Sequence, residues 1–464
     1  MDREKMIEEL TQIVGKENIL FTETDLFLYG YDASLVKAKP DCIVLPGSTE
    51  EVSRVVKYAH QNGIPVVPRG SGTNLSGGTV AFKGGIVLHF SRMNRILEID
   101  TENQRAVVEP GLFTLALKTM LGRYGYIYQP DPASEKVSTF GGNFAENSGG
   151  PHCLKYGVTT NHVLGAEIVL SDGEVINVGG KALDNPGYDL TGVLVGSEGT
   201  MGIATKLILR IMPKPEAVKT MLAIYGSLED AGRTVSAIIA DGILPATLEI
   251  LDNNTIKAVE ASVKAGYPLD AAAVLLIELD GMRDGMERLA ERIMEICKKS
   301  NAREVKVAQT EAERNQLWAG RRGAFGAVAR LRPNYLVCDG TVPRTKLPEV
   351  LKKVVEITKK YNLEVANVFH AGDGNLHPLI LFDERNEDEL RRVHAAGSEI
   401  LKVCADAGGT ISGEHGIGVE KMKEMCFVFS DRDIEAMKRV KKAFDPKDVM
   451  NPGKVLPPAE SCAH

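Results

Sequence analysis

Apolar positions in the first part of the chain form short runs separated by one stretch with helical spacing. The run at residues 41–46 predicts a strand, and small apolar residues recur every three or four positions over 49–62, which predicts a helix. Gly63 ends that helix, and IPVVP follows as a second short strand. The pattern indicates a strand–helix–strand unit. Further strands are expected at 86–90, 96–99, 105–109, 163–170, 174–178 and 203–211.

The pattern changes after Pro213 and Pro215, which mark a predicted domain boundary. Beyond it, strands and long amphipathic helices alternate, which is typical of an α+β domain with a mainly antiparallel sheet and helices on one face. The last part, from residue 418, is expected to be helical until Pro446. The expected strands are 218–225, 246–251, 273–280, 334–342, 363–369 and 378–382, and the expected helices are 229–240, 282–299, 311–331, 346–360 and 386–407.

Composition limits the class of protein. The 464 residues are 44% hydrophobic and carry a net charge of −7, which indicates two or three globular domains and argues against a nucleic-acid-binding role. No apolar run approaches the ~20 residues of a membrane span, and the N-terminus is an amphipathic, charged helix without a signal core. We therefore expect a cytoplasmic protein that reaches a membrane face only through partners.

The seven cysteines are scattered, and no two have C-x2-C spacing. An iron–sulfur or zinc-ribbon site within this chain is therefore not expected. The odd count also argues against a disulfide framework, and most of these residues are expected to be small buried side chains.

Glycine is clustered in three segments of the first half. They are RGSGTNLSGG at 69–78, STFGGNFAENSGG at 138–150 and LVGSEGTMGI at 194–203. Glycine-rich turns bring backbone amides close to a ligand, and successive amides form an anion-binding concavity. Turn formation explains any one segment. The three together favour a distributed cradle for a large ligand with a diphosphate.

Three of the nine histidines lie in two further glycine-punctuated segments. His370 and His377 belong to HAGDGNLH, and Glu414 and His415 belong to SGEHGIG. Two imidazoles and a carboxylate suit a divalent ion such as zinc, iron or manganese, although histidines in such loops are also ordinary hydrogen-bonding residues. In the segment WAGRR, Arg321 is a candidate carboxylate ligand or a surface cation on the predicted helix.

Together with the turn at Pro130–Pro132 and the ending NPGK, the glycine segments resemble the FAD-binding domain of the vanillyl-alcohol oxidase/p-cresol methylhydroxylase type. Nearly the whole chain is similar to FAD-linked 2-hydroxyacid dehydrogenases. The resemblance implies a two-part FAD domain (1–215), a substrate and metal cap domain (216–417) and a returning C-terminal segment (418–464). The first glycine segment has no histidine or cysteine for a covalent tether, so noncovalent FAD is expected. The implied FAD contacts are Arg69, Gly70, Ser71, Gly72, Thr73, Asn74, Pro132, Ser138, Gly141, Gly142, Asn143, Ala145, Glu198, Gly199, Gly202, Ile203 and Asn451.

The same resemblance implies roles in catalysis. It makes His370, His377 and Glu414 the metal ligands, His415 the general base and Arg321 the substrate-binding arginine. The implied reaction deprotonates the metal-bound hydroxyl and transfers a hydride to flavin N5. Electrons then pass to an external acceptor, such as an iron–sulfur subunit, an electron-transferring flavoprotein or a quinone.

Substrate size is suggested by two apolar positions. The 2-hydroxyglutarate enzymes have a lysine near Val337 and an asparagine near Leu379, so a small monocarboxylate, D-lactate or glycolate, fits this chain better. A D-2-hydroxyglutarate dehydrogenase and a flavin-carrying non-catalytic subunit remain the main alternatives. A phenol oxidase on the same fold and a metal-dependent hydrolase are weaker ones. The sequence leaves the oligomeric state open, with a homo-oligomer among the options.

Overall fold

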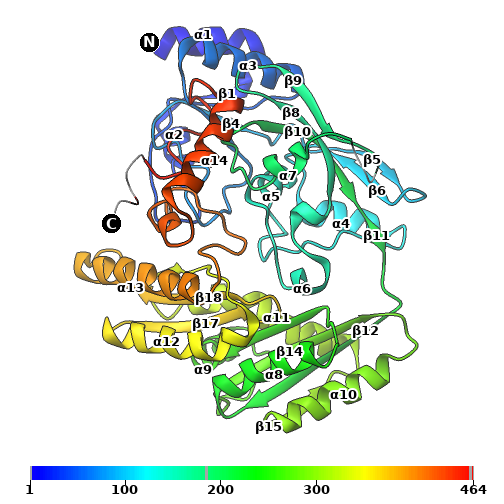
Figure 1. Ribbon diagram of the computed structural model, residues 1–464. Coiled ribbons are helices and arrows are strands. Elements are labelled where there is room, and N and C mark those ends of the chain that lie inside the picture. The colour runs from blue at the N-terminus through cyan, green and yellow to red at the C-terminus, as the bar shows by residue number, and fades with distance from the viewer. Residues whose placement is uncertain (1–2, 183–185, 459–461, 463–464) are drawn as a thin grey trace. The chain divides into compact units, whose positions relative to one another are not determined.

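The computed structural model describes residues 3–182, 186–458 and 462 (Figure 1). It divides the chain into two compact units. Unit 1 contains residues 1–149, 158–214 and 414–464, and unit 2 contains residues 150–157 and 215–413. Among the described helices, none is both long and apolar enough to cross a lipid bilayer.

Unit 1 contains two main sheets. The first has the order β1-β2-β4-β3, in which β2, β3 and β4 run parallel, and the second is antiparallel with the order β5-β6-β10-β8-β9. The strands are β1 (Ile19–Leu20), β2 (Cys42–Val44), β3 (Val66–Arg69), β4 (Ile86–His89), β5 (Ile96–Asp100), β6 (Arg105–Val108), β8 (Val163–Val169), β9 (Val175–Gly179) and β10 (Ile203–Arg210), with the small pair β7 (Tyr126–Ile127) and β11 (Met212–Pro213). The helices are α1 (Arg3–Val14), α2 (Glu23–Leu28), α3 (Thr49–Asn62), α4 (Thr114–Gly122), α5 (Phe140–Glu146), α7 (Leu190–Leu194) and α14 (Asp431–Phe444).

Helix α3 shows how the sequence pattern forms a crossover between parallel strands. Ser48 caps its first turn by accepting a hydrogen bond from the amide of Glu51, and Gly63 ends it in the left-handed conformation with φ 64°. Its apolar stripe is fully buried against the first sheet. Burial of each valine of that stripe stabilises the unit by ~1.5–3 kcal/mol. The predicted strand–helix–strand unit is therefore present.

Unit 2 is built on an antiparallel seven-stranded sheet with the order β15-β12-β14-β13-β17-β18-β16. The strands are β12 (Ala217–Tyr225), β13 (Thr247–Asp252), β14 (Ala273–Gly281), β15 (Ala302–Val307), β16 (Asn334–Val337), β17 (Glu364–His370) and β18 (Asn375–Phe382). The helices are α6 (Cys153–Tyr156), α8 (Leu228–Ala240), α9 (Asn253–Ser262), α10 (Met286–Lys299), α11 (Glu311–Val328), α12 (Leu347–Lys360) and α13 (Glu387–Asp406).

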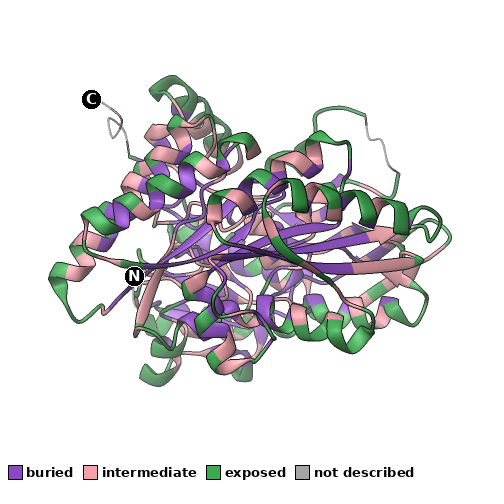
Figure 2. Cartoon of the chain, turned by 90° about the horizontal axis from the view of Figure 1, so that it is seen from below, coloured by how far each residue is buried: buried purple, intermediate pink, exposed green. Residues whose placement is uncertain are grey.

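The expectation that helices cover one face of this sheet is wrong. Helices α9 and α11 pack on one face, and α8, α10, α12 and α13 pack against the same strands from the other (Figure 1). The interior strands β13 and β18 are buried at every position. Figure 2 shows buried strands running between helices that are partly exposed. A continuous apolar run, rather than strict alternation of apolar and polar residues, is typical of a strand that is buried on both faces. Such strands in unit 2 need helices on both faces of the sheet.

The predicted domain limits differ from the two units at residues 150–157, at Pro215 and at residues 414–417. Residues 150–157 belong to unit 2 because Lys155 and Tyr156 hydrogen-bond the carboxylate of Asp280 on β14. The C-terminal segment of unit 1 begins already at Glu414.

One disulfide contradicts the expectation from cysteine spacing. Cys426 and Cys462 are bonded across 36 residues, with their Cα atoms 5.3 Å apart. Distance along the chain does not report proximity in space, which is why this pair could not be predicted from spacing. The other five cysteines form no disulfide within the described part of the chain, and four of them are buried as expected.

Candidate functional site

The three glycine-rich segments meet in unit 1. Gly70 lies so close to the second segment that a Cβ atom there would be 2.2 Å from Oγ1 of Thr139. The third segment joins the second through the amide of Glu198, which donates to the carbonyl of Ala145 at 2.8 Å. Gly199 has φ +68°, and a Cβ atom there would lie 2.4 Å from Pro68. Only glycine satisfies both the backbone conformation and this close approach.

The closing NPGK sequence joins these segments. The side-chain amide of Asn451 donates to the carbonyls of Gly78 (2.9 Å) and Glu198 (2.7 Å). Lys454 Nζ donates to the same Gly78 carbonyl and to Asn451 Oδ1, both at 2.7 Å. Burial lowers the pKa of Lys454 to about 7 despite the nearby carboxylates of Asp32 and Glu198. The C-terminal segment is therefore an integral part of the glycine-rich cradle.

The first glycine segment has the properties of an anion site. The backbone amides of residues 70–74 donate no hydrogen bond to any described residue of the chain. The side chain of Arg69 supports the turn from within, where it donates to Oγ1 of Thr79 at 3.1 Å and lies over the ring of Tyr29. A run of unused amides in a glycine turn fits the diphosphate of a dinucleotide such as FAD.

Several predicted FAD contacts hold the cradle together through their own side chains. Asn143 donates to Oγ1 of Thr114 at 2.8 Å, and the Ser138 hydroxyl lies 3.0 Å from the same atom. All the predicted FAD contacts lie in unit 1. Their part in cofactor binding stays a prediction. The second segment also contains helix α5, which the glycine pattern did not predict and which is capped by the Thr139 hydroxyl.

Glu198 has a role that sequence reasoning missed. Its carboxylate accepts hydrogen bonds from the amides of Ile417 (2.6 Å) and Gly418 (2.8 Å), so it holds the segment that follows His415. Burial raises the pKa of Glu198, and these two amides oppose that rise. The glycine-rich context marked Glu198 as a cofactor contact and did not reveal this anchoring role.

Unit 2 contains a buried cluster around Glu249. Its carboxylate accepts from Nε of Arg321 through Oε2 at 2.5 Å and lies 2.8 Å from Nδ1 of His370 through Oε1. Glu249 and His370 are direct cross-strand partners on β13 and β17, and α11 lays Arg321 over the same face. The arginine is 2% exposed, so it is not the surface cation that was the alternative.

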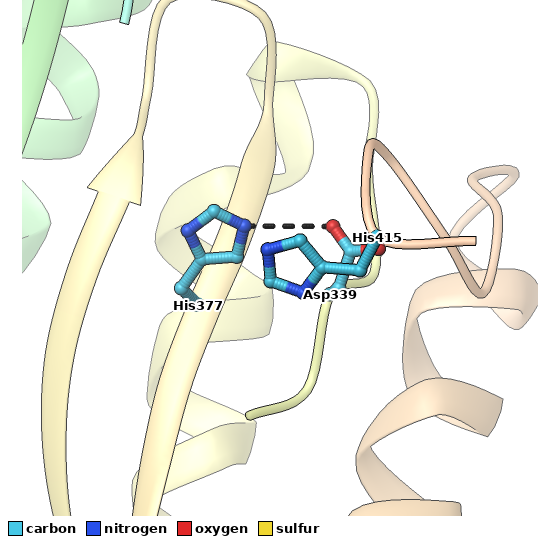
Figure 3. Close-up of side chains that lie close together, drawn as sticks. All are labelled: Asp339, His377 and His415. Carbon is cyan, nitrogen blue, oxygen red and sulfur yellow. Dashed lines mark ion pairs between the residues drawn. The ribbon is translucent and has the colours of Figure 1, made fainter. Parts of the chain in front are cut away.

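His377 on β18 is close to His370. The two imidazole centroids are 5.0 Å apart and edge-on, and both residues are buried. Nε2 of His377 lies 3.4 Å from Oδ1 of Asp339 (Figure 3). Asp339 also accepts from the Ser412 hydroxyl and, through its carbonyl, from the amide of Gly413 at 2.8 Å. Two adjacent buried imidazoles with carboxylate partners are a donor set that fits a divalent metal ion.

Sequence reasoning missed three buried carboxylates, Glu249, Asp339 and Glu278. Glu278 accepts from Nε1 of Trp318 at 2.6 Å and from Nε of Arg314 at 3.1 Å. Burial alone would raise the pKa of Glu278, but the hydrogen bonds and positive charges around it lower it to about 2. The sequence signal that could have found Glu249 and Glu278 is a carboxylate within an apolar strand, because a buried carboxylate has to be paired.

Comparisons with known proteins agree with this architecture. A model of the FAD binding domain matches residues 40–179, and a model of the C-terminal domain of FAD linked oxidases matches residues 214–455. This chain belongs to the FAD-linked oxidase family. It is 44% identical over 464 residues to the glycolate oxidase subunit GlcD of Escherichia coli K12, covering 100% of this chain and 93% of that protein.

Two other relatives are similar over nearly the whole chain. The GlcD subunit of Bacillus subtilis is 47% identical over 451 residues, covering 97% of this chain and 96% of that protein. The D-lactate dehydrogenase of Archaeoglobus fulgidus is 35% identical over 459 residues, covering 97% and 99%. The chain is thus an FAD-linked oxidoreductase of the glycolate oxidase GlcD and D-lactate dehydrogenase type.

Solved structures confirm the expected fold. p-Cresol methylhydroxylase with substrate bound superposes with a TM-score of 0.82 at 20% identity, covering 97% of this chain and 96% of that one. A 4-ethylphenol oxidase from Gulosibacter chungangensis gives 0.80 at 18% identity, with the same coverage of both chains. The fold class is α+β of the p-cresol methylhydroxylase type, as the glycine segments predicted.

Proposed function

We propose that this protein is an FAD-dependent dehydrogenase that oxidises a small 2-hydroxy monocarboxylate, glycolate or D-lactate, to the 2-oxoacid. The observation that carries the proposal is the buried arginine of unit 2. Arg321 lies beside His370 and is held there by Glu249. The arginine can bind the carboxylate of a 2-hydroxyacid, and the two imidazoles can bind a metal ion. A 2-hydroxyacid that binds through a metal ion needs both kinds of group.

Noncovalent FAD is proposed to bind unit 1 through the predicted contacts. Its diphosphate would lie on the amides of residues 70–74, and Asn451 would complete the cradle. When bound, FAD supplies a two-electron acceptor. The chain itself supplies the donors that place the cofactor and the buried surroundings that exclude water from it.

The metal is proposed to be zinc, iron or manganese, held by His370, His377 and Glu414. Glu414 follows directly after Gly413, whose amide is bound to the carbonyl of Asp339, so chain continuity keeps it near the end of that hydrogen-bonded segment. When bound, the ion supplies a Lewis acid that makes the substrate hydroxyl easier to deprotonate.

His415 is proposed as the general base, which takes the hydroxyl proton. Its segment ends on the carboxylate of Glu198, through the amides of Ile417 and Gly418, and this anchor limits the movement of the imidazole. Arg321 is proposed to hold the substrate carboxylate. Because Nε is engaged by Glu249, the edge formed by its two terminal nitrogens is the one left to face a ligand.

Two apolar side chains support the proposal that the substrate is a monocarboxylate. The register of β16 and β18 makes Val337 and Leu379 direct cross-strand partners, and Leu379 lies on the same face as His377 two residues earlier. The positions at which a dicarboxylate enzyme would place a lysine and an asparagine are therefore adjacent and apolar here. A second carboxylate would have no cationic partner at this pair and would be poorly solvated.

The electron acceptor is proposed to be a partner protein, either an iron–sulfur subunit or an electron-transferring flavoprotein. The relatives named GlcD are each a subunit of glycolate oxidase, which makes a protein partner plausible. In this chain, the described cysteines show no grouping that could carry a cluster.

The test is flavin bleaching without oxygen. We expect glycolate or D-lactate to reduce the purified holoprotein fast, and D-2-hydroxyglutarate to do so at least ~10-fold more slowly, the effect of ~1.4 kcal/mol of lost transition-state binding. A chelator should abolish the bleaching while FAD stays bound, and added Mn²⁺ should restore it. Faster reduction by D-2-hydroxyglutarate would make the protein a dicarboxylate enzyme. Reduction by none of the three would instead favour a non-catalytic subunit.

A further inference from the structure

We propose that Glu249 is a positioning residue that prepares His370 for metal binding and, through the same carboxylate, fixes Arg321. The inference rests on the proposed metal site and goes beyond its ligand set. Glu249 is fully buried in the middle of β13, with no exposed surface. A charged side chain at such a position is stable only when its oxygens are fully paired, and the pairing defines what the residue does.

The geometry determines the tautomer of His370. Nδ1 lies 2.8 Å from Oε1 of Glu249 and 3.3 Å from a terminal nitrogen of Arg321. A carboxylate only accepts and a guanidinium only donates, so Nδ1 can satisfy one of them. The shorter distance assigns the proton to Nδ1, which donates to Glu249. Nε2 then keeps its lone pair, which is the form of imidazole that binds a metal ion.

The other bonds of Glu249 make it rigid. Oε1 also accepts from the Thr247 hydroxyl at 3.2 Å, and Oε2 accepts from Nε of Arg321. Thr247 and Glu249 lie on the same face of β13, and His370 is opposite on β17. One carboxylate thus fixes the rotamer of the arginine and the ring plane of the histidine, although the two come from elements far apart in sequence.

Glutamine at position 249 would break this arrangement. Its single oxygen can accept from His370 or from Arg321, and its amide group would face the other donor with a donor of its own. Aspartate keeps the charge but is one methylene shorter, so it cannot reach both partners. Loss of a carboxylate behind a ligating histidine typically weakens metal affinity 10- to 100-fold.

Glu278 offers a matched control. It is a buried carboxylate on the neighbouring strand β14, and it also pairs with an arginine of α11, Arg314. Its histidine partner is His152, which is not among the proposed metal ligands. Glu278→Gln therefore removes the same charge from the same sheet face and should weaken folding in a comparable way, while it leaves His370 in place.

The experiment measures Mn²⁺ affinity by chelator competition on FAD-loaded, metal-stripped protein, with FAD content and thermal unfolding as folding checks. We expect the dissociation constant to rise about 10- to 100-fold in Glu249→Gln and Glu249→Asp. In Glu278→Gln it should stay within about threefold of wild type, because Glu249 still orients His370.

Unchanged affinity in both Glu249 variants would overturn the inference and leave the proposed function standing. An equal loss in Glu278→Gln would also overturn it, because the effect would then be general destabilisation. A wild-type protein that takes up no Mn²⁺ would overturn the proposed ligand set together with this inference. If Glu249→Gln fails to fold, the charge-conserving Glu249→Asp decides the question.

Discussion

His415→Asn is expected to lower kcat by about 10²- to 10⁴-fold, the usual contribution of a positioned general base. Asparagine is close in size and still forms hydrogen bonds, but it cannot take a proton near neutral pH. The anchor of this segment is the bond from the amides of Ile417 and Gly418 to Glu198, which the substitution does not touch. FAD content should therefore stay at the wild-type level. Steady-state kinetics with a soluble electron acceptor measure the effect.

The control for this variant is His394→Asn. His394 is an exposed residue of α13, outside the proposed machinery, and the same chemical change there should leave kcat unaltered. A kcat for His415→Asn within twofold of wild type would exclude His415 as the base.

Arg321→Lys is expected to lower kcat/KM by about 10- to 100-fold, chiefly through a higher KM. Lysine keeps the positive charge beside Glu249, so the buried carboxylate is not left without a cation. Unlike arginine, however, lysine cannot bind the Glu249 carboxylate and at the same time offer two parallel N–H donors to the substrate carboxylate. The lost charge-assisted hydrogen bond to the substrate is worth roughly 1.5–3 kcal/mol, which corresponds to that range.

Arg322→Lys is the matched control, because the neighbouring arginine is exposed and lies over the ring of Trp318. Its kinetics should resemble wild type. Equal losses in Arg321→Lys and Arg322→Lys would mean that helix α11 is disturbed as a whole and that Arg321 has no special contact with the substrate.

The sequence predicted those elements whose signal is local. Helix α3 follows from its apolar spacing and from Ser48 and Gly63, and the glycine segments predicted the cofactor domain that the family models confirm. Most strands of unit 2 lie within a few residues of their expected limits. Among the differences, β18 begins at Asn375 rather than 378, β16 ends at Val337 rather than 342, and strand β15 and helix α9 were not expected at all. These differences reflect tertiary context.

The sequence could not predict contacts that depend on the register of paired strands or on the path of the C-terminal segment back to unit 1. Glu249 becomes the partner of His370 only because β13 pairs with β17 in one particular register. Nothing in the letters around position 249 encodes a residue 121 positions away. Glu198 likewise anchors a segment more than two hundred residues later. Such pairings become visible once the sheet order and the path of the C-terminal segment are known.

The proposed function requires that one 2-hydroxyacid molecule reduce one FAD in this protein. The direct measurement is an anaerobic titration of the purified holoprotein with glycolate, and separately with D-lactate, that follows flavin absorption and assays the 2-oxoacid formed. We expect one of the two acids to bleach the flavin completely and to yield one mole of 2-oxoacid per mole of FAD. A flavin that stays oxidised with both acids, with no 2-oxoacid formed, would contradict the proposed function.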